Sequence, residues 1–356
     1  MNYPVCAVEF ALKRREAIRL SLRRSAALAL GSGCFWPGQS IGQNNAQTTA
    51  FPQRAVKLIV PNSPGSSIDT IGRILSTHLS AYFSIALNAN QNIIVENKAG
   101  AAGALGLEVG RAMPADGYAL MLASSSSLSV APLLQKAVKY EPLKDFELIA
   151  LVALLPNVLV CNASLPVTSM ASFVAYAKAR PGRINMASAG LGSVSHLAGV
   201  ALGSAAGFES LHVPYKGGSQ SAASVVSGET HWTLTPAPNA MSLVKAGRLK
   251  VLGHSMARNA SPLDDVPSIA DTVAGFEYVS WIGLVAPKGL SNAVAQLLRN
   301  GIAAALQQLQ LKESFALNGA VAPALAQLSG QAFREFLTQD IEQNRRVIRM
   351  AAVPME

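Results

Sequence analysis

The chain has little cysteine. Only Cys6, Cys34 and Cys161 occur in its 356 residues, and the first two lie within the N-terminal fifty. After residue 50 this leaves a single thiol inside an apolar run, which excludes a disulfide framework and a cysteine metal cluster there. The histidines show no metal-ligand spacing either. We therefore expect no metal site and no cofactor.

Charged residues and long hydrophobic runs are also scarce. Charged residues make up 14% of the chain and aromatic residues 6%, whereas 50% are hydrophobic. This composition excludes a disordered chain and predicts a large buried core in one or two domains. The apolar stretches after residue 50 are interrupted too soon to cross a bilayer, which needs about 20 apolar residues in succession.

Residues 1–50 differ from the rest. A basic block at 13–24 precedes a short apolar run at 26–33 and a polar segment at 39–49. This order is typical of a cleaved export signal, and we expect cleavage within 38–50 and a periplasmic protein. Arg23 and Arg24 leave a twin-arginine route open, and a disordered basic tail is the alternative.

The net charge falls from +9 to +5 when the six basic and two acidic residues of that leader are subtracted. This diffuse positive balance suits a small anionic ligand and gives no argument for nucleic acid.

The first candidate binding element lies in residues 56–75. An apolar strand pattern ends at Pro61, a turn of Ser, Pro and Gly follows, and Asp69 begins a helical pattern. A helix N-terminus carries unpaired N–H groups and the positive end of the macrodipole, so it can bind a carboxylate or phosphate. The alternative is an ordinary connection with a Ser or Asp cap.

A second copy of this arrangement occurs in residues 184–199. A short strand pattern runs into Ser188-Ala189-Gly190-Leu191-Gly192-Ser193, and a helix begins near Ser195. The two glycines allow a ligand to approach the backbone or permit positive φ. The alternative is a turn that serves only the fold. Ligands of α/β sheets bind at the carboxyl ends of strands, where both loops fall.

Strand and helix patterns alternate along the chain and indicate a mostly parallel α/β protein. The strands are too many for one compact sheet, so we predict two lobes joined through crossings at 153–160 and 281–287. Residues 51–154 plus 284–356 would form the first lobe and residues 155–283 the second. Further loops at the carboxyl ends of strands are 214–219, with Tyr215, and the serine run 124–127.

An enzyme is the competing interpretation. A serine hydrolase needs a nucleophile, a base and an acid within reach, and no G-x-S-x-G motif occurs. Ser193 and His196 are the only pair that we can name for such chemistry.

A set of motifs in a fixed order resembles the extracytoplasmic solute-binding proteins of tripartite tricarboxylate transporters, the Bug family. The motifs are Pro61-x-x-Pro64-Gly65-x-x-x-Asp69, Val95-Glu96-Asn97, Gly100-Ala101-x-Gly103, Asp116-Gly117-Tyr118, Tyr140-x-Pro142-x-Lys144-Asp145-Phe146, Ser188-Ala189-Gly190-x-Gly192-Ser193-x-x-His196-Leu197, Val213-Pro214-Tyr215-Lys216-Gly217 and Trp281-x-Gly283-Leu284-x-Ala286-Pro287.

The resemblance implies a two-lobed periplasmic binding protein fold (type II-like), with helices flanking a mostly parallel sheet in each lobe and a ligand cleft between the lobes. It also implies that both glycine loops face a carboxylate. The implied ligand-binding residues are Pro64, Gly65, Ser66, Ser67, Asp69, Ser188, Ala189, Gly190, Gly192, Ser193, His196, Tyr215, Gly217 and Thr235. The family usually has Asp at the position of Thr235, and this loss of charge favours a plain carboxylate over an amino acid.

The resemblance therefore predicts a monomeric periplasmic receptor, not an enzyme, that passes a small carboxylate to membrane permease subunits. The alternatives are a sensor that presents its closed form to a signalling partner and, less favoured, the serine-dependent hydrolase.

Overall fold

One long strand joins two sheets in the computed structural model, which describes residues 51–257, 261–263, 265–350, 353 and 355. The predicted export signal lies outside the described residues. The long strand is β4 (Phe146–Asn162), which pairs with β9 (Val279–Pro287) as far as Pro156. From Asn157 onward it pairs instead with β7 (Trp232–Pro236) and β8 (Leu249–His254). The two sheets therefore share β4.

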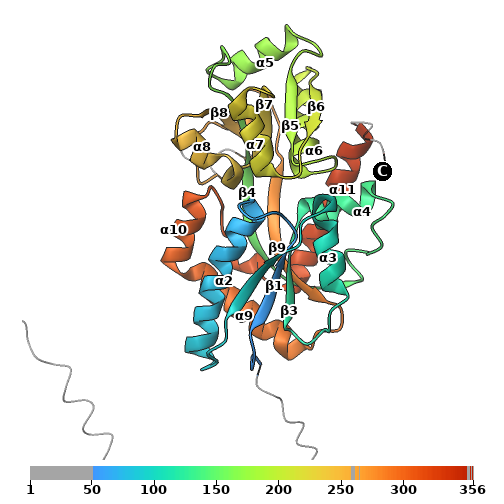
Figure 1. Cartoon of the computed structure of the whole chain (residues 1–356), viewed down its shortest axis with the longest axis vertical. Coiled ribbons are helices and arrows are strands. Elements are labelled where there is room, and N and C mark those ends of the chain that lie inside the picture. Colours follow the sequence, from blue (N-terminus) through green and yellow to red (C-terminus); the bar gives the residue numbers. More distant parts are fainter. Residues whose placement is uncertain (1–50, 258–260, 264, 351–352, 354, 356) are drawn as a thin grey trace, which may run out of the picture. The chain divides into compact units, whose positions relative to one another are not determined.

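Lobe 1 is built on the sheet β2–β1–β3–β9–β4, in the lower part of Figure 1. Alternate residues of a strand point to opposite faces of its sheet. Leu58 accordingly packs in the core beneath α2, α9 and α10, and Ile59 packs in the core beneath α3 and α11. Its other elements are β1 (Val56–Val60), α2 (Ser67–Ala86), β2 (Ile93–Asn97), η1 (Ala101–Gly103), α3 (Ala104–Arg111), β3 (Ala119–Ser124), η2 (Ser125–Val130), α4 (Ala131–Leu134), α9 (Asn292–Gln307), α10 (Leu309–Leu317), η5 (Leu325–Gln327) and α11 (Gly330–Met350).

Lobe 2 is built on the last part of β4 together with β5, β6, β7 and β8, in the upper part of Figure 1. Phe173 of α5, Leu197 of α6 and Trp232 of β7 share one core, and Val225 of α7 lies in the core on the other face. Its further elements are α5 (Met170–Lys178), β5 (Asn185–Ser188), α6 (Val194–Ala206), β6 (Leu211–Pro214), α7 (Gly218–Ser227), η3 (Ala237–Asn239), α8 (Met241–Lys245) and η4 (Ile269–Asp271).

The predicted two-lobed α/β fold is confirmed, and its sheets are mixed. Strands β1, β2 and β3 are parallel, as are β5, β6 and β7. The joining strands β4 and β9 run antiparallel to their neighbours. A chain that passes to a second lobe and returns must enter the first sheet in both directions, which explains the antiparallel pairs.

Strand β4 contains a proline and includes the predicted crossing at 153–160. The proline is Pro156, and a proline cannot donate a ladder hydrogen bond. Its position is tolerated because β4 changes partner there: Pro156 is opposite Val279 of β9, and Asn157 is opposite Pro236 of β7.

Helix α11 packs against both lobes. Phe333 and Leu337 near its start lie in a core of lobe 1, whereas Val347 and Ile348 near its end pack against a core of lobe 2.

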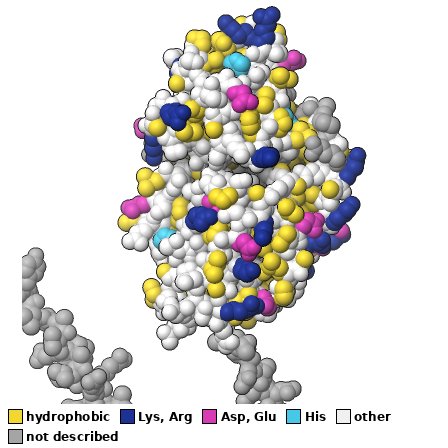
Figure 2. All heavy atoms as spheres, viewed as in Figure 1, with side chains coloured by type: hydrophobic (Ala, Val, Ile, Leu, Met, Phe, Trp, Pro, Cys, Tyr) yellow, Lys and Arg dark blue, Asp and Glu magenta, His cyan; other side chains and the backbone are white. Residues whose placement is uncertain are grey.

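Charged side chains are dispersed over the face seen in Figure 2, with basic and acidic groups interspersed in its lower half. This face therefore carries no continuous patch of one sign. Within the described part of the chain, no helix is both long and apolar enough to cross a membrane.

Candidate functional site

The turn between β1 and α2 is closed by a reciprocal pair of hydrogen bonds. Ser66 is the N-cap, and its hydroxyl accepts from the N–H of Asp69 at 3.4 Å. The Asp69 carboxylate in return accepts from the N–H of Gly65 at 2.9 Å. Gly65 has φ of 77°, a conformation that favours glycine. Side-chain caps of this kind use up N–H groups that a helix start leaves unpaired.

The Asp69 carboxylate also accepts hydrogen bonds from two side chains. Arg73 approaches it at 3.0 Å, and the Asn97 amide donates to it at 2.9 Å. Burial by itself would raise the pKa of Asp69, but the hydrogen bonds from Arg73, Gly65 and Asn97 outweigh it and hold the pKa below its usual value. Asp69 is therefore an ionised support of the turn.

The turn between β5 and α6 repeats the same arrangement with a different side chain. Ser193 is the N-cap and accepts from the N–H of His196 at 3.3 Å. His196 Nδ1 in return accepts from the N–H of Gly192 at 3.2 Å, and Gly192 has φ of 68°. Gly65-Ser66-x-x-Asp69 and Gly192-Ser193-x-x-His196 are thus equivalent turns, one in each lobe.

His196 is neutral in this position. Its ring stacks on His212 with 3.9 Å between centroids. Burial, and after it the His212 ring, lowers the pKa of His196 to about 4, and burial lowers the pKa of His212 to about 4. Because Nδ1 accepts from Gly192, the proton of the neutral ring is on Nε2.

The first amide of each helix bonds to the other lobe. The N–H of Ser67 in α2 donates to Asn239 Oδ1 at 2.8 Å, and the N–H of Val194 in α6 donates to Ser126 Oγ at 3.0 Å. Ser219 Oγ adds a third contact of this kind, to the carbonyl of Gly65 at 2.9 Å. These contacts hold the lobes closed.

Asn239 is fixed from lobe 2. Its Nδ2 donates to Thr235 Oγ1 at 2.9 Å, which leaves Oδ1 for Ser67. A Cβ on Gly218 would lie 2.2 Å from Asn239 Nδ2, so only glycine admits this side chain. Thr235, predicted to bind ligand, accepts the hydrogen bond that orients Asn239.

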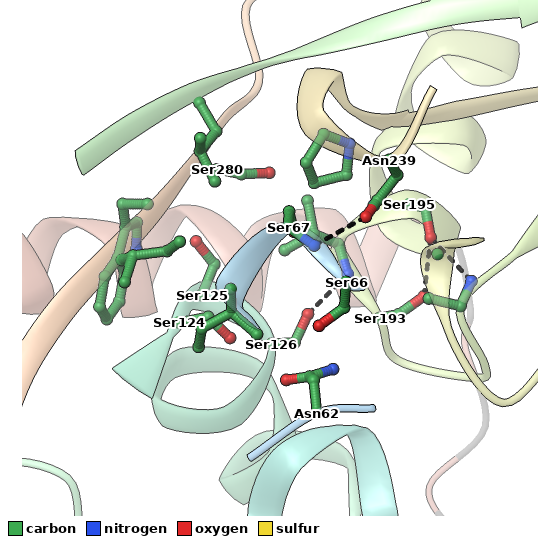
Figure 3. Close-up of a pocket in the computed structure, with 18 residues that line it drawn as sticks. Asn62, Ser66, Ser67, Ser124, Ser125, Ser126, Ser193, Ser195, Asn239 and Ser280 are labelled. Atoms are coloured by element: carbon green, nitrogen blue, oxygen red, sulfur yellow. Dashed lines mark hydrogen bonds between the residues drawn. The ribbon is translucent and has the colours of Figure 1, made fainter. Parts of the chain in front are cut away.

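The second amide of each helix remains unpaired. Among the described residues, the N–H groups of Ile68 and Ser195 have no acceptor within hydrogen-bond distance. Both residues line one cavity of about 60 Å³ between the lobes. Figure 3 shows Ser124, Ser125 and Ser126 on one side of this cavity, Ser193, Ser195 and Asn239 on the other, and Ser66 and Ser67 between them. The full lining is Asn62, Ser66, Ser67, Ile68, Ser124, Ser125, Ser126, Leu155, Ala189, Ser193, Val194, Ser195, Gly218, Pro236, Asn239, Ser280, Trp281 and Ile282.

The cavity presents hydrogen-bond donors without any ionised lining side chain. The oxygens of Ser66 and Ser126 already accept from backbone N–H groups, so their hydroxyl hydrogens are left for a ligand. With the unpaired amides and the positive ends of α2 and α6, these donors suit an anion.

The predicted site residues divide into two groups. Ser66, Ser67, Ala189 and Ser193 line the cavity, and Gly190 and Tyr215 line a neighbouring cavity of about 360 Å³ that shares Asn62 and Ala189 with it. The others lie outside the lining of both: Pro64, Gly65, Asp69, Ser188, Gly192, His196, Gly217 and Thr235.

Sequence reasoning missed several lining residues. The serine run 124–127 is among the loops expected at the carboxyl ends of strands, and the structure adds that Ser124 caps a π-helical turn, η2, through reciprocal bonds with Ser127. Asn239 and Ser280 carry no local motif. Trp281 belongs to the motif Trp281-x-Gly283-Leu284-x-Ala286-Pro287, but that motif gave no indication that the side chain lines a cavity.

Ser193 and His196 are not arranged as nucleophile and base. Ser193 Oγ donates to the carbonyl of Gly190 at 2.7 Å, and the Nδ1 of His196 is occupied by Gly192. Both side chains hold the turn. Over the described ranges, no group of His, Cys, Asp and Glu could hold a metal ion.

Comparisons with known proteins identify a family. A family model described as "Tripartite tricarboxylate transporter family receptor" matches residues 82–353. A UPF0065 protein of Pseudomonas sp. (strain P51), from the tcbD-tcbE intergenic region, is 33% identical over 74% of this chain and 80% of its own. Protein BugT of Bordetella pertussis is 31% identical over 84% of this chain and 90% of its own.

Solved structures show the same fold. Rpa4515 of R. palustris with adipate has a TM-score of 0.80 at 28% identity, covering 85% of this chain and 99% of that one. MatC of Rhodopseudomonas palustris with bound malate has a TM-score of 0.76 at 25% identity, covering 84% and 100%.

Proposed function

Because this chain belongs to the tripartite tricarboxylate transporter receptor family, we propose that it captures a small carboxylate in the cavity between its lobes and delivers it to the permease subunits of such a transporter. One observation carries the proposal: Ile68 and Ser195, from opposite lobes, line the same uncharged cavity, and the N–H groups of both are unpaired among the described residues. Adipate in Rpa4515 and malate in MatC support a carboxylate as the ligand class.

The carboxylate is held by neutral donors. The N–H groups of Ile68 and Ser195 and the hydroxyls of Ser66 and Ser126 surround it, and the helix N-termini supply partial positive charge. Hydrogen bonds to an ionised acceptor are roughly twice as strong as neutral ones, so a few of them suffice. The predicted residues outside the lining, among them Asp69 and His196, act by shaping the turns.

Capture is a closing motion in this proposal. The lobes, which we place at 51–154 plus 284–356 and at 155–283, move about the joining strands β4 and β9, and the Ser67–Asn239 and Val194–Ser126 contacts form on closing. The protein acts as a monomer in the periplasm, and residues 1–50 contain the signal for its export. It performs no chemistry, since Ser193 and His196 are both engaged in the turn.

A thermal-shift panel tests the proposal. The protein is heated with acetate, propionate, lactate, malate, adipate and citrate, and with propionamide as an uncharged control. A ligand at a hundred times its dissociation constant stabilises the folded protein by about 2.7 kcal/mol. A response to at least one carboxylate and none to propionamide is expected, and no response to any carboxylate would contradict the proposal.

Asn239→Asp gives a second test, since it keeps the acceptor for Ser67 but adds a negative charge to the cavity. Like charges about 5 Å apart repel by about 3 kcal/mol at an effective dielectric constant of about 20, or roughly 100-fold in affinity. Asn300→Asp, at an exposed position of α9, is the matched control and should leave affinity unchanged.

A further inference from the structure

The closed cavity is small. Its volume of about 60 Å³ is less than half that of the roughly 150 Å³ cavity that holds a benzene ring, so its occupant is small. The contacts from Ser67 to Asn239 and from Val194 to Ser126 keep the lobes at this separation. A carboxylate group therefore leaves space for few further non-hydrogen atoms.

The lining also limits the charges that a ligand can carry. Because no lining side chain is ionised, an ammonium group would find no carboxylate and a second carboxylate would find no cation. The free amides of Ile68 and Ser195 serve one anionic group where the two helices meet. An amino acid or a dicarboxylate would bury an uncompensated charge, which is costly.

One buried hydroxyl in the lining has no partner. Ser125 is 1% exposed, and its Oγ has no hydrogen-bond partner among the described residues. On β9, Ser280 Oγ donates to Asn157 Oδ1 at 2.8 Å, so its lone pairs remain available. Buried polar atoms without partners are rare, and one that lines a cavity indicates a ligand atom that bonds to it. Leu155 and Ile282, each 1% exposed, form an apolar wall beside these groups.

From these observations we infer that the ligand is a short monocarboxylate of two or three carbons with a hydroxyl or oxo group next to the carboxylate. The carboxylate lies at the starts of α2 and α6, the second oxygen bonds to Ser125, and any methyl group packs on Leu155 and Ile282. This inference rests on the proposed function of the same cavity.

Calorimetric titration of the unaltered protein tests the size and the second oxygen together. The ligands are glycolate, lactate, pyruvate, propionate, malate and adipate. At least one of the first three should bind about fivefold more tightly than propionate, which lacks the second oxygen, since one hydrogen bond contributes about 1 kcal/mol. Malate and adipate should bind more weakly still.

The outcomes separate the two proposals. Tight binding of malate or adipate with weak binding of the short acids overturns the inference and leaves the receptor function intact. No binding by any carboxylate overturns both.

A pair of variants tests the role of Ser125. Ser125→Ala should weaken binding of the preferred hydroxy or oxo acid by about fivefold and leave propionate unchanged, because only the second oxygen loses its partner. Ser129→Ala is the matched control: Ser129 is in the same turn and is also 1% exposed, but it does not line this cavity. Melting without ligand verifies that both variants fold. Equal effects of the two variants, or an equal loss of propionate binding in Ser125→Ala, would overturn the assignment.

Discussion

The two capped turns have the same hydrogen-bond pattern, but the accepting side chain is charged in one turn and neutral in the other. In lobe 1 the side chain that reaches back to the glycine N–H is Asp69, an ionised carboxylate compensated by Arg73. In lobe 2 it is His196, a neutral ring stacked on His212. The geometry needs only an acceptor at the third helical position, and either a charge or an imidazole nitrogen supplies it.

The difference shows where the attraction for an anion must come from. The negative charge of Asp69 is compensated by Arg73, Asn97 and Gly65, and His196 carries no charge at neutral pH. Neither turn therefore places a charged side chain in the cavity lining, and the amides and hydroxyls carry the recognition.

The largest loss of stability is expected when the charged turn of lobe 1 is disrupted. Asp69→Ala leaves the donors of Gly65, Asn97 and Arg73 without their acceptor, and we expect the free energy of unfolding to fall by about 3 kcal/mol. His196→Ala, which frees one backbone donor, should cost about 2 kcal/mol. Urea denaturation at pH 7 measures both, and a larger loss in His196→Ala would show that the charged turn is not the more demanding one.

The glycines give a comparison of strain. Gly65 and Gly192 both have positive φ, where an L side chain costs about 1–2 kcal/mol. A Cβ on Gly192 would also lie 2.9 Å from Leu134 Cδ1, whereas one on Gly65 would meet nothing within 4 Å. Gly192→Ala should therefore destabilise the protein by about 2 kcal/mol and Gly65→Ala by about 1 kcal/mol.

Gly217→Ala is the control for this pair, because Gly217 is extended at φ −179° and a Cβ at this position would meet no heavy atom within 4 Å. Its unfolding free energy should stay close to that of the unaltered protein. A loss as large as that of Gly65→Ala would point to a cause other than backbone strain.

The two turns should respond to acid at different pH values. The folded pKa of His196 and of His212 is about 4, below the ordinary 6.5, so the unfolded chain takes up protons first. The two histidines therefore contribute fully to the free energy of unfolding above pH 6.5, and this contribution is lost as the pH falls toward 4. Asp69, whose pKa is lowered from 3.8, loses its contribution only below that pH.

Melting temperatures from pH 8 to pH 3 measure this difference, and His212→Asn should flatten the profile between pH 6.5 and 4. Asp340 needs its own control, because burial raises its pKa to about 6. Its contribution has the opposite sign: it is present below pH 3.8 and is lost as the pH rises through 6. The profile is therefore best recorded in an Asp340→Asn background. An unchanged slope in His212→Asn would contradict the assignment.

The smallest loss of stability is expected when one of the two hydrogen bonds between the lobes, Ser67–Asn239 or Val194–Ser126, is removed. Asn239→Ala and Ser126→Ala each remove the acceptor of one first helical amide, and each should cost about 1 kcal/mol. Equal losses in urea denaturation would support reciprocal contacts. A large effect of one and none of the other would show that a single contact holds the lobes.

The sequence predicts the local parts of this site and not the long-range ones. Gly65, Ser66 and Asp69 act on one another within four residues, as do Gly192, Ser193 and His196, so their spacing reveals both turns. Asn239 lies 172 residues from Ser67, and Ser126 lies 68 residues from Val194. Their roles depend on how the lobes meet, which no local pattern encodes.

The same distinction holds for the fold. The predicted strand that ends at Pro61 and the predicted helix that begins near Ser195 match the end of β1 and the start of α6 closely, because their hydrophobic periodicity is local. The sequence does not predict the single strand β4, since the partner change that accommodates Pro156 is a tertiary event.

Dividing the donors between the lobes has a consequence for unloading. Each lobe contributes one free helical N–H group and a few hydroxyls to the cavity. These donors are too few for one lobe alone to hold an anion in competition with water. If the cavity binds a carboxylate as proposed, separating the two lobes by a small distance is enough to release it. No lining side chain has to change its protonation state, because none is ionised.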